Sequence, residues 1–145
     1  MRQAAAATFS EQVMGSTSSS QADKPLTHTI QELRRSRASI LSYLLKLNKC
    51  IDAQHRDLVQ AVARRFSETL IDYISYGHFR LFTSCHPACH HVPVIENTTQ
   101  SVLRFNDQYA HSAAIDLNRI KQDLEGLALT LEVHFEIEDE MISQN

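Results

Sequence analysis

Leu70-Ile-Asp-Tyr-Ile-Ser-Tyr-Gly-His-Phe79 is the stretch of this 145-residue sequence that says most about its fold. Leu70, Tyr73 and Ile74 follow the spacing of three and four residues that places side chains on one face of an α-helix. Asp72 and Ser75 fall on the opposite side, and we expect them to face solvent. Gly77 lies inside the same pattern, where a glycine costs about 1 kcal/mol relative to alanine. We therefore expect a local bend or a close backbone approach there.

The helical pattern continues on the N-terminal side of this stretch. Its apolar residues are Ile30, Leu33, Ile40, Leu41, Leu44, Leu47 and Ile51, followed by Leu58, Val62, Phe66, Leu70, Tyr73, Ile74 and Leu81. One helix over residues 29–82 would be about 80 Å long at 1.5 Å per residue, too long for a compact domain of this size. We therefore expect a break between Asn48 and Asp52. Thr29 and Glu32 have the spacing of a capping box, which predicts that the first helix begins there.

Two further helices are expected in the second half of the chain. Their apolar faces consist of Ile95, Thr98, Val102, Phe105, Tyr109 and Ala113, and of Ile120, Leu124, Leu127, Leu131, His134, Phe135 and Ile142. The last helix should start near Asp116 or Asn118. Residues 85–93 include two prolines and should form the main connection. Four amphipathic helices with short links predict an all-α, antiparallel (up-and-down) four-helix bundle.

The composition agrees with a helical protein. Three Gly and three Pro in the whole chain are too few for a β-sandwich or barrel with many turns. Residues 1–27 are rich in Ala, Ser and Thr without any period, so we expect a flexible tail followed by one helical domain over 28–145. No apolar run is long enough for a membrane span or a secretory signal. Three cysteines, an odd number, fit a reducing compartment, and a cytoplasmic location is expected.

Charge is unevenly distributed along the chain. Residues 28–82 contain nine Lys or Arg against five Asp or Glu, whereas residues 93–145 contain three against ten. The two segments can therefore attract each other. The basic residues are spread over two helices, whereas a nucleic-acid-binding protein concentrates them on one exposed face. We expect no direct binding of nucleic acid.

The last predicted helix ends in a cluster of acidic residues. Glu136, Glu138, Asp139 and Glu140 lie at its C-terminal end, where the helix dipole is negative and each carboxylate costs a few tenths of a kcal/mol. Three interpretations are open: the carboxylates form a solvated face, or they are compensated by the basic group at Arg34, Arg35 and Arg37, or by a basic partner.

The densest set of potential metal ligands is Cys85, His86, Cys89, His90 and His91. Thiolate and imidazole are ligands that zinc prefers, but a closed structural site usually needs a second, distant pair, and none is evident. A solvated loop without metal is the interpretation we adopt. We therefore predict no metal ligand and no cofactor.

His134 and Glu138 stand four residues apart on the core-facing side of the last predicted helix. Bundles that hold two irons use such pairs together with matching ligands from other helices. The first two helices offer only His28, His55 and His78, all near helix ends. A hydrogen bond between histidine and carboxylate, either buried or at the rim of the bundle, is therefore the expected role of the pair.

The sequence contains no recognisable catalytic motif. A Gly-rich phosphate loop and a G-x-S-x-G motif are both missing from the printed sequence. Cys50 and Cys85 fit idle or buried thiols better than nucleophiles. We do not expect an enzyme.

Residues 70–79 resemble the Rsd/AlgQ family, regulators that bind the primary sigma factor of bacterial RNA polymerase. The sequence motif [LV]-x-D-Y-[LIV]-S-x-G-H-F is characteristic of that family. Three further segments resemble it in the same order: Arg37-x-x-Ile-Leu-x-x-Leu-Leu-x-Leu47, Glu96-Asn-Thr-Thr-Gln100 and Leu131-Glu-x-x-Phe-x-Ile-Glu-Asp139. Together they cover residues 30–142.

The resemblance implies a helical bundle that acts as an anti-sigma factor by binding region 4 of the primary sigma factor. Region 4 is a helix-turn-helix with a basic DNA-facing surface, so an acidic partner surface suits it. The partner-binding residues that we predict from the resemblance are Asp72, Ser75, His78, Phe79, Arg37, Glu138 and Asp139. Asp72 is expected to matter most.

Two alternatives remain open. One is a metal-binding bundle, with zinc or two irons, that uses the segment 85–91 or the pair His134 and Glu138. The other is a bundle that keeps the scaffold and binds a different protein. It is suggested by Arg64-Arg65, where relatives tend to be acidic, and by Leu33, where the family usually has Trp. The oligomeric state is not predicted.

Overall fold

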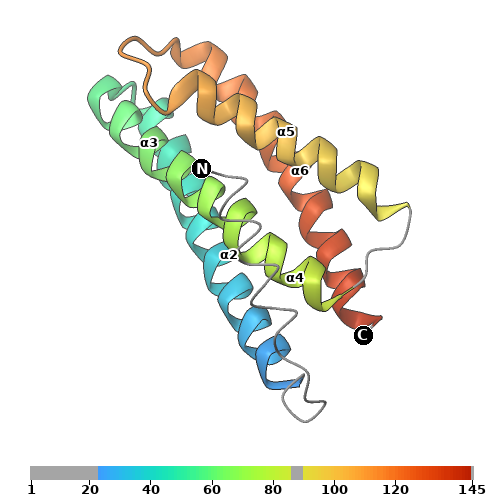
Figure 1. Ribbon diagram of the computed structural model, residues 1–145. Coiled ribbons are helices and arrows are strands. Elements are labelled where there is room, and N and C mark those ends of the chain that lie inside the picture. Colours follow the sequence, from blue (N-terminus) through green and yellow to red (C-terminus); the bar gives the residue numbers. More distant parts are fainter. Residues whose placement is uncertain (1–22, 86–89, 145) are drawn as a thin grey trace.

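The chain folds into a bundle of helices (Figure 1). The computed structural model describes residues 23–85 and 90–144, and the regular structure in these ranges is entirely helical. The elements are α2 (Asp23–Asp52), α3 (Arg56–Asp72), the π-helix η2 (Tyr73–His78), α4 (Phe79–Ser84), α5 (His91–Tyr109) and α6 (Leu117–Ser143). The all-α prediction is confirmed. Residues 1–22 of the expected tail lie outside the described residues, and residues 23–27 belong to α2.

Side-chain contacts show that α2 and α6 run in opposite directions. Lys121, near the start of α6, is paired with Asp52 at the end of α2. Asp139, near the end of α6, is paired with Arg37 in the first half of α2. Figure 1 shows the same alternation around the bundle, with α3 and α4 returning along α2 and α6 returning along α5.

Helix α2 begins at Asp23, earlier than predicted. Pro25 lies in its first turn, where the backbone N–H groups have no acceptor within the helix and proline is tolerated. Thr29 is buried inside the helix, so the predicted capping box is wrong. The predicted break is confirmed: α2 ends at Asp52, and Gln54, with a φ of 56°, takes the left-handed conformation that turns the chain into α3.

The connection before α5 is shorter than predicted. Helix α5 begins at His91, so Pro93 occupies its first turn instead of interrupting the helical pattern. Residues 86–89 of the connection lie outside the described residues. The predicted start of α6 is confirmed, because the Asp116 carboxylate accepts hydrogen bonds from the backbone N–H groups of Asn118 (3.0 Å) and Arg119 (3.3 Å).

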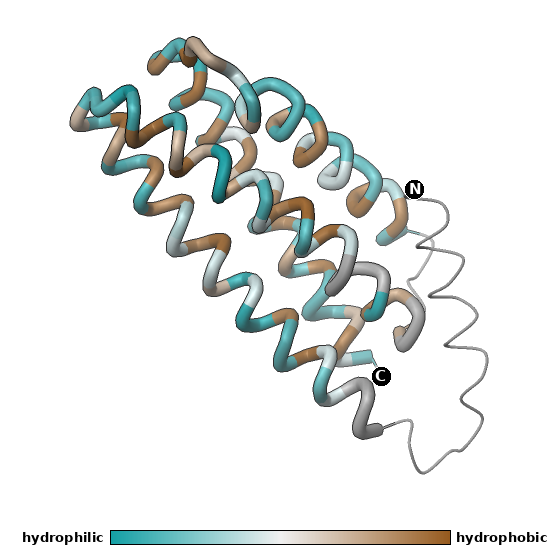
Figure 2. Tube along the Cα trace, turned by 60° about the vertical axis from the view of Figure 1, so that its left-hand side comes forward, coloured by the Kyte–Doolittle hydropathy of each residue, from teal (hydrophilic) through white to brown (hydrophobic). Residues whose placement is uncertain are grey.

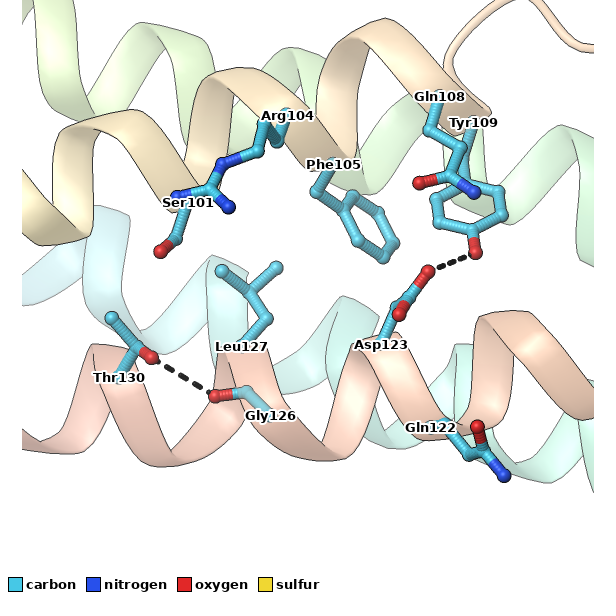
Figure 3. A pocket seen from close by; sticks show the side chains of 10 residues that line it. All are labelled: Ser101, Arg104, Phe105, Gln108, Tyr109, Gln122, Asp123, Gly126, Leu127 and Thr130. Atoms are coloured by element: carbon cyan, nitrogen blue, oxygen red, sulfur yellow. Dashed lines mark hydrogen bonds between the residues drawn. The ribbon is translucent and has the colours of Figure 1, made fainter.

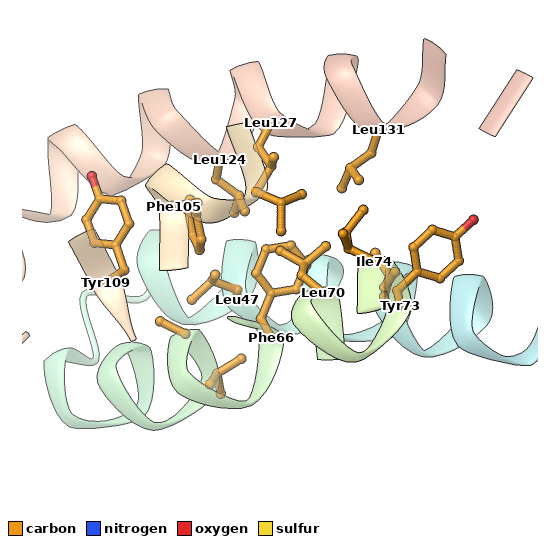
Figure 4. Packing of buried hydrophobic residues seen from close by; sticks show 14 of the residues in the cluster. Leu47, Phe66, Leu70, Tyr73, Ile74, Phe105, Tyr109, Leu124, Leu127 and Leu131 are labelled. Carbon is orange, nitrogen blue, oxygen red and sulfur yellow. The ribbon is translucent and has the colours of Figure 1, made fainter. Parts of the chain in front are cut away.

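Apolar and polar residues recur along the helices (Figure 2), and buried apolar residues from α2, α3, α5 and α6 form one core cluster. Figure 4 shows aliphatic and aromatic side chains around Phe66, with Tyr73 and Tyr109 at opposite ends and their hydroxyls pointing away from it. Leu41 and Leu58 were expected in the core but are 51% and 49% exposed. A helix turns by about 100° per residue, and Val59 occupies the core position beside Leu58.

Two further findings concern the end of α5 and the length and polarity of the helices. Ala113, expected on the core face of the third helix, is exposed and lies beyond the end of α5. In the part of the chain that the structure describes, every helix is too short or too polar to cross a membrane.

Helix α3 continues through η2 into α4 without a break. A π-helix has i→i+5 hydrogen bonds and is rare, occurring mostly as a single turn inside an α-helix and frequently at functional sites. The irregularity expected around Gly77 is present in this form, since Gly77 belongs to η2. Residues 70–79 therefore span the end of α3, the π-turn and the first residue of α4.

Candidate functional site

A cluster of polar and aromatic side chains lies where η2 meets α2 and α6. We call it the Arg37 network, and it consists of Arg37, Tyr73, His134, Phe135, Glu138 and Asp139. Arg37 comes from α2, Tyr73 is the first residue of η2, and the other four belong to α6. The network therefore joins three elements that are far apart in the sequence.

Arg37 is the centre of the network. Its Nη1 donates a hydrogen bond to Asp139 Oδ1 at 2.7 Å, and its Nη2 donates to Glu138 Oε1 at 3.1 Å and to the Phe135 carbonyl oxygen at 3.3 Å. Its Nε donates to the Tyr73 hydroxyl oxygen at 3.3 Å. The guanidinium carbon lies 4.9 Å from the centre of the Phe135 ring, a cation–π distance. All three nitrogens of the guanidinium are engaged, so its position is closely defined.

Glu138 is the buried acceptor of the network, with a fully buried side chain. The Tyr73 hydroxyl donates a short hydrogen bond to Glu138 Oε1, and His134 Nε2 lies 3.2 Å from Glu138 Oε2. Burial by itself would raise the pKa of Glu138, but the contacts with His134, Tyr73 and Arg37 outweigh it and lower that pKa. His134 and Glu138, for which a buried or rim hydrogen bond was expected, lie together as a fully buried ion-pair contact.

The pKa values of Tyr73 and Arg37 are both shifted by burial and by neighbouring members of the network. Burial, followed by the negative charge of Glu138, raises the pKa of Tyr73 despite the opposing effect of Arg37, so the phenol remains a neutral donor. Burial would lower the pKa of Arg37, but its contacts with Tyr73, Asp139 and Glu138 outweigh this effect and raise it. The network is therefore a neutral phenol between a fixed cation and a fixed carboxylate.

The arrangement is suited to positioning rather than to catalysis. Each polar atom of Arg37 and the Oε1 atom of Glu138 are occupied by neighbours in the fold. A buried ion pair of this kind favours one relative position of the elements that carry it, because a displacement that separates the partners leaves buried charges unpaired. The network thus holds η2 against α2 and α6.

Two of the remaining predicted residues lie at the surface, close to Tyr73 in the sequence. Asp72, the last residue of α3, and Ser75, in η2, are both exposed as predicted. Among the side chains that the structure describes, none forms an ion pair with Asp72. The side chain of Asp139 is 62% exposed although it is paired with Arg37. The side chains of His78 and Phe79 lie outside the described residues.

The predicted site residues therefore fall into two groups. Arg37, Glu138 and Asp139 are brought into direct contact, and Glu138, being fully buried, has a supporting position rather than a surface one. Asp72 and Ser75 lie on the outer side of the adjoining helical segment. The ion pair between Arg37 and Asp139 shows that a basic residue of the first helix compensates the acidic end of the last. Arg34 and Arg35 are exposed.

Sequence reasoning missed the polar role of Tyr73, which was expected only as a core residue. It is a core residue, 1% exposed, but its hydroxyl links Arg37 to Glu138. A signal was present: Arg37 and Glu138 both occupy core-facing positions of their helices. Two opposite charges at such positions are an indication of a buried pair between helices, because a lone buried charge is too costly.

A second surface feature is a groove of about 300 Å³ between α5 and α6 (Figure 3). It is lined by residues that include Arg104, Phe105, Gln108, Asp123, Gly126 and Thr130. Figure 3 shows the Tyr109 hydroxyl bonded to Asp123 at one end of the groove and Thr130 bonded to the Gly126 carbonyl at the other. None of the predicted partner-binding residues lines it.

Comparisons with known proteins point to one family. A family model described as "Regulator of RNA polymerase sigma(70) subunit, Rsd/AlgQ" matches residues 14–145. "Regulator of sigma D" from Pectobacterium atrosepticum is 33% identical over 94 residues, which cover 54% of this chain and 61% of that protein. "Regulator of sigma D" from Yersinia enterocolitica is 25% identical over 109 residues, covering 61% of this chain and 62% of that protein. The matched part is thus less than two thirds of either relative, and no solved structure matches the chain significantly.

Proposed function

The chain belongs to the Rsd/AlgQ family, and from this membership we propose that it is an anti-sigma regulator of transcription. In this proposal it binds the primary sigma factor of bacterial RNA polymerase through sigma region 4. The bound sigma factor is held away from the core polymerase and from the promoter. The action is stoichiometric binding, which requires neither catalysis nor a cofactor.

The observation that carries the proposal is the position of the family signature on the bundle. Leu70, Tyr73 and Ile74 are buried, and they anchor the segment in the core. Asp72, directly before the π-turn, and Ser75, within it, are exposed. Sigma region 4 presents basic side chains that otherwise meet DNA phosphates. An exposed carboxylate that forms no ion pair within the described residues is a suitable acceptor for such a side chain.

The Arg37 network contributes to this function indirectly. Tyr73 follows Asp72 directly, and its hydroxyl is bonded to Glu138 and Arg37. The network therefore sets the position of the backbone that carries Asp72 and Ser75. Asp139, which is mostly exposed, is the member of the network that can also contact a partner. Because the network is formed within this chain alone, the surface is organised before binding, which lowers the entropic cost of association.

Size-exclusion chromatography of the full chain mixed with isolated sigma region 4 tests the proposal. We expect co-elution at low salt for the wild type and for Glu125→Arg, a reversal at an exposed carboxylate of α6 that serves as the matched control. We expect no co-elution for Asp72→Arg, with helicity and melting temperature unchanged. Unchanged binding by Asp72→Arg would refute the role of Asp72, and absence of any complex with the wild type would refute the function.

A different protein partner is the second candidate function. The observation in its favour is that Arg64 and Arg65 are both exposed on α3 and give this face a basic character. Arg64 Nε donates to the Ala110 carbonyl at 3.3 Å, and Arg65 lies 3.6 Å from Glu68. A pull-down from host lysate separates the two candidates. Recovery of a protein other than sigma, lost in the variant Arg64→Glu/Arg65→Glu, would favour the second.

A further inference from the structure

Three potential metal ligands meet where α5 begins and α6 ends. His90 is the residue before α5, His91 is its first residue, and Glu140 lies in the last turn of α6. Their ligand atoms all lie within 4.8 Å of one another. His91 Nε2 lies 3.1 Å from Glu140 Oε2, and the centres of the two imidazole rings are 4.2 Å apart. We propose that His90, His91 and Glu140 form a binding site for Zn²⁺.

The donor set fits this ion. Imidazole nitrogen and carboxylate oxygen bind Zn²⁺ at about 2.0 to 2.2 Å, so two ligand atoms of a tetrahedral site are about 3.3 Å apart. The separation between His91 and Glu140 already has this size. His90 is exposed, so its ring can rotate to complete the site without disturbing the core. Three protein ligands leave a fourth position for water, as in other open zinc sites.

Burial and charge favour the same site. The side chain of His91 is fully buried, so its orientation towards Glu140 is defined by packing rather than by solvent. Glu140 is 55% exposed, which leaves the site open to an entering ion. It also lies at the negative end of the α6 dipole, beside Glu138 and Asp139, whose two negative charges are only partly compensated by the single positive charge of Arg37. A divalent cation on Glu140 compensates the remaining charge.

The buried thiol of Cys85 is not part of the proposed site. The potential ligand atoms that meet here, among the described residues, are those of His90, His91 and Glu140. The site therefore relies on nitrogen and oxygen ligands from α5 and α6. It differs from a cysteine-based site in the 85–91 segment in that one ligand comes from a distant helix.

A bound ion would clamp the start of α5 to the end of α6. Glu140 is two residues from Glu138, so the clamp and the Arg37 network secure the same final turns of α6 from two sides. Because only the folded chain brings the three ligands together, zinc should raise the melting temperature as its concentration increases.

The test uses the untagged full chain, stripped of metal and titrated with ZnCl₂ by calorimetry, with bound zinc measured by elemental analysis. We expect about one zinc ion per chain and a rise in melting temperature for the wild type. His90→Ala and Glu140→Gln should each weaken binding by at least about tenfold, since even the loss of outer-sphere partners has an effect of this size. Both residues are exposed, and His90 makes no side-chain capping bond, so both variants should fold.

Matched controls are His111→Asn and Glu136→Gln, which change an exposed histidine and an exposed glutamate elsewhere. Both should bind zinc as the wild type does. Absence of zinc from the wild type would overturn the proposal, as would full binding by both His90→Ala and Glu140→Gln. Loss of zinc in Cys89→Ser, with retention in those two variants, would place the ion in the connection and likewise overturn the proposed ligand set.

Discussion

Arg37 Nη2 and Glu138 Oε1 lie 3.1 Å apart, and they join an arginine that is 14% exposed to a glutamate with no exposed side-chain surface. The two residues are 101 positions apart in the sequence. Their contact connects α2 to α6, and the Tyr73 hydroxyl connects both to η2. The first three predictions concern this contact.

Replacement of Arg37 by methionine should strongly destabilise the bundle. It keeps much of the side-chain volume but leaves Glu138 buried without its cation, a change that costs about 3 to 5 kcal/mol in comparable cases. Urea denaturation followed by circular dichroism measures the free energy of unfolding. Arg34→Met, at an exposed arginine of the same helix, should change it by less than about 0.5 kcal/mol. Equal effects of the two substitutions would contradict the buried pair.

Acid should remove the stabilisation that Glu138 provides. Its pKa in the folded state is lowered from an ordinary value of 4.5, so the unfolded chain binds the proton first. This stabilisation is complete above pH 4.5 and is lost as the pH falls through the lowered pKa. The free energy of unfolding measured between pH 2 and 7 should therefore converge for the wild type and Glu138→Gln at low pH. Glu136→Gln, at an exposed carboxylate, should run parallel to the wild type.

Loss of the Tyr73 hydroxyl should be costly although the ring remains. Tyr73→Phe removes the hydrogen bond to the Glu138 carboxylate, and bonds to charged groups contribute about 1.5 to 3 kcal/mol. The raised pKa of Tyr73 also means that its contribution is complete below pH 10 and is lost as the pH rises towards the folded-state value. Unfolding measured at pH 7 and pH 11 should show both effects. Tyr43→Phe, at a partly buried tyrosine, keeps Tyr73 and should therefore retain the stability of the wild type at pH 7 and still show the alkaline loss.

Gly126→Ala should stabilise the protein. Gly126 lies inside α6 and is exposed, and nothing lies within 4 Å of the position that its Cβ would occupy. Alanine is favoured over glycine in a helix interior by about 0.5 to 1 kcal/mol. Thermal melting should show a higher midpoint for the variant. A lower midpoint would mean that the groove of Figure 3 closes on Gly126 in solution.

Binding to sigma region 4, as proposed above, should depend on salt. Exposed charges such as Asp72 attract a basic partner over about 10 Å at 0.1 M ionic strength and over less at higher salt. Stopped-flow measurements should therefore give an association rate that falls as salt increases. Asp72→Asn should lower the rate and flatten this dependence, whereas Glu125→Gln should leave both unchanged. The same salt dependence in Asp72→Asn and in the wild type would exclude a steering role for Asp72.

The helices themselves could be predicted well from the spacing of apolar residues. Leu33, Ile40 and Leu47 are fully buried because the helical period places them on one face. Helix ends were harder to predict. The Thr29–Glu32 pattern is found inside α2, because a capping pattern is short and its residues are also acceptable within a helix.

The candidate site could be predicted only in part. Exposure of Asp72 and Ser75 follows from the helical period, and the contact between His134 and Glu138 follows from their spacing of four. The core-facing positions of Arg37 and Glu138 indicate a buried pair, but the individual contacts of Arg37 do not follow from a local pattern. They depend on how α2 packs against α6, which is a property of the whole bundle.

The π-turn has a consequence for the length of the chain at this point. Helix geometry assigns each residue about 100° of rotation, and a π-turn accommodates one residue more than the α-helix around it. A one-residue deletion within Tyr73–His78 that converts the π-turn into regular α-helix would remove the residue that the wider turn absorbs, so Leu81, which is fully buried, would keep its place in the core. In an alignment of related chains, a one-residue gap should therefore be tolerated here better than in the regular helix on either side, where it would rotate every following side chain by about 100°.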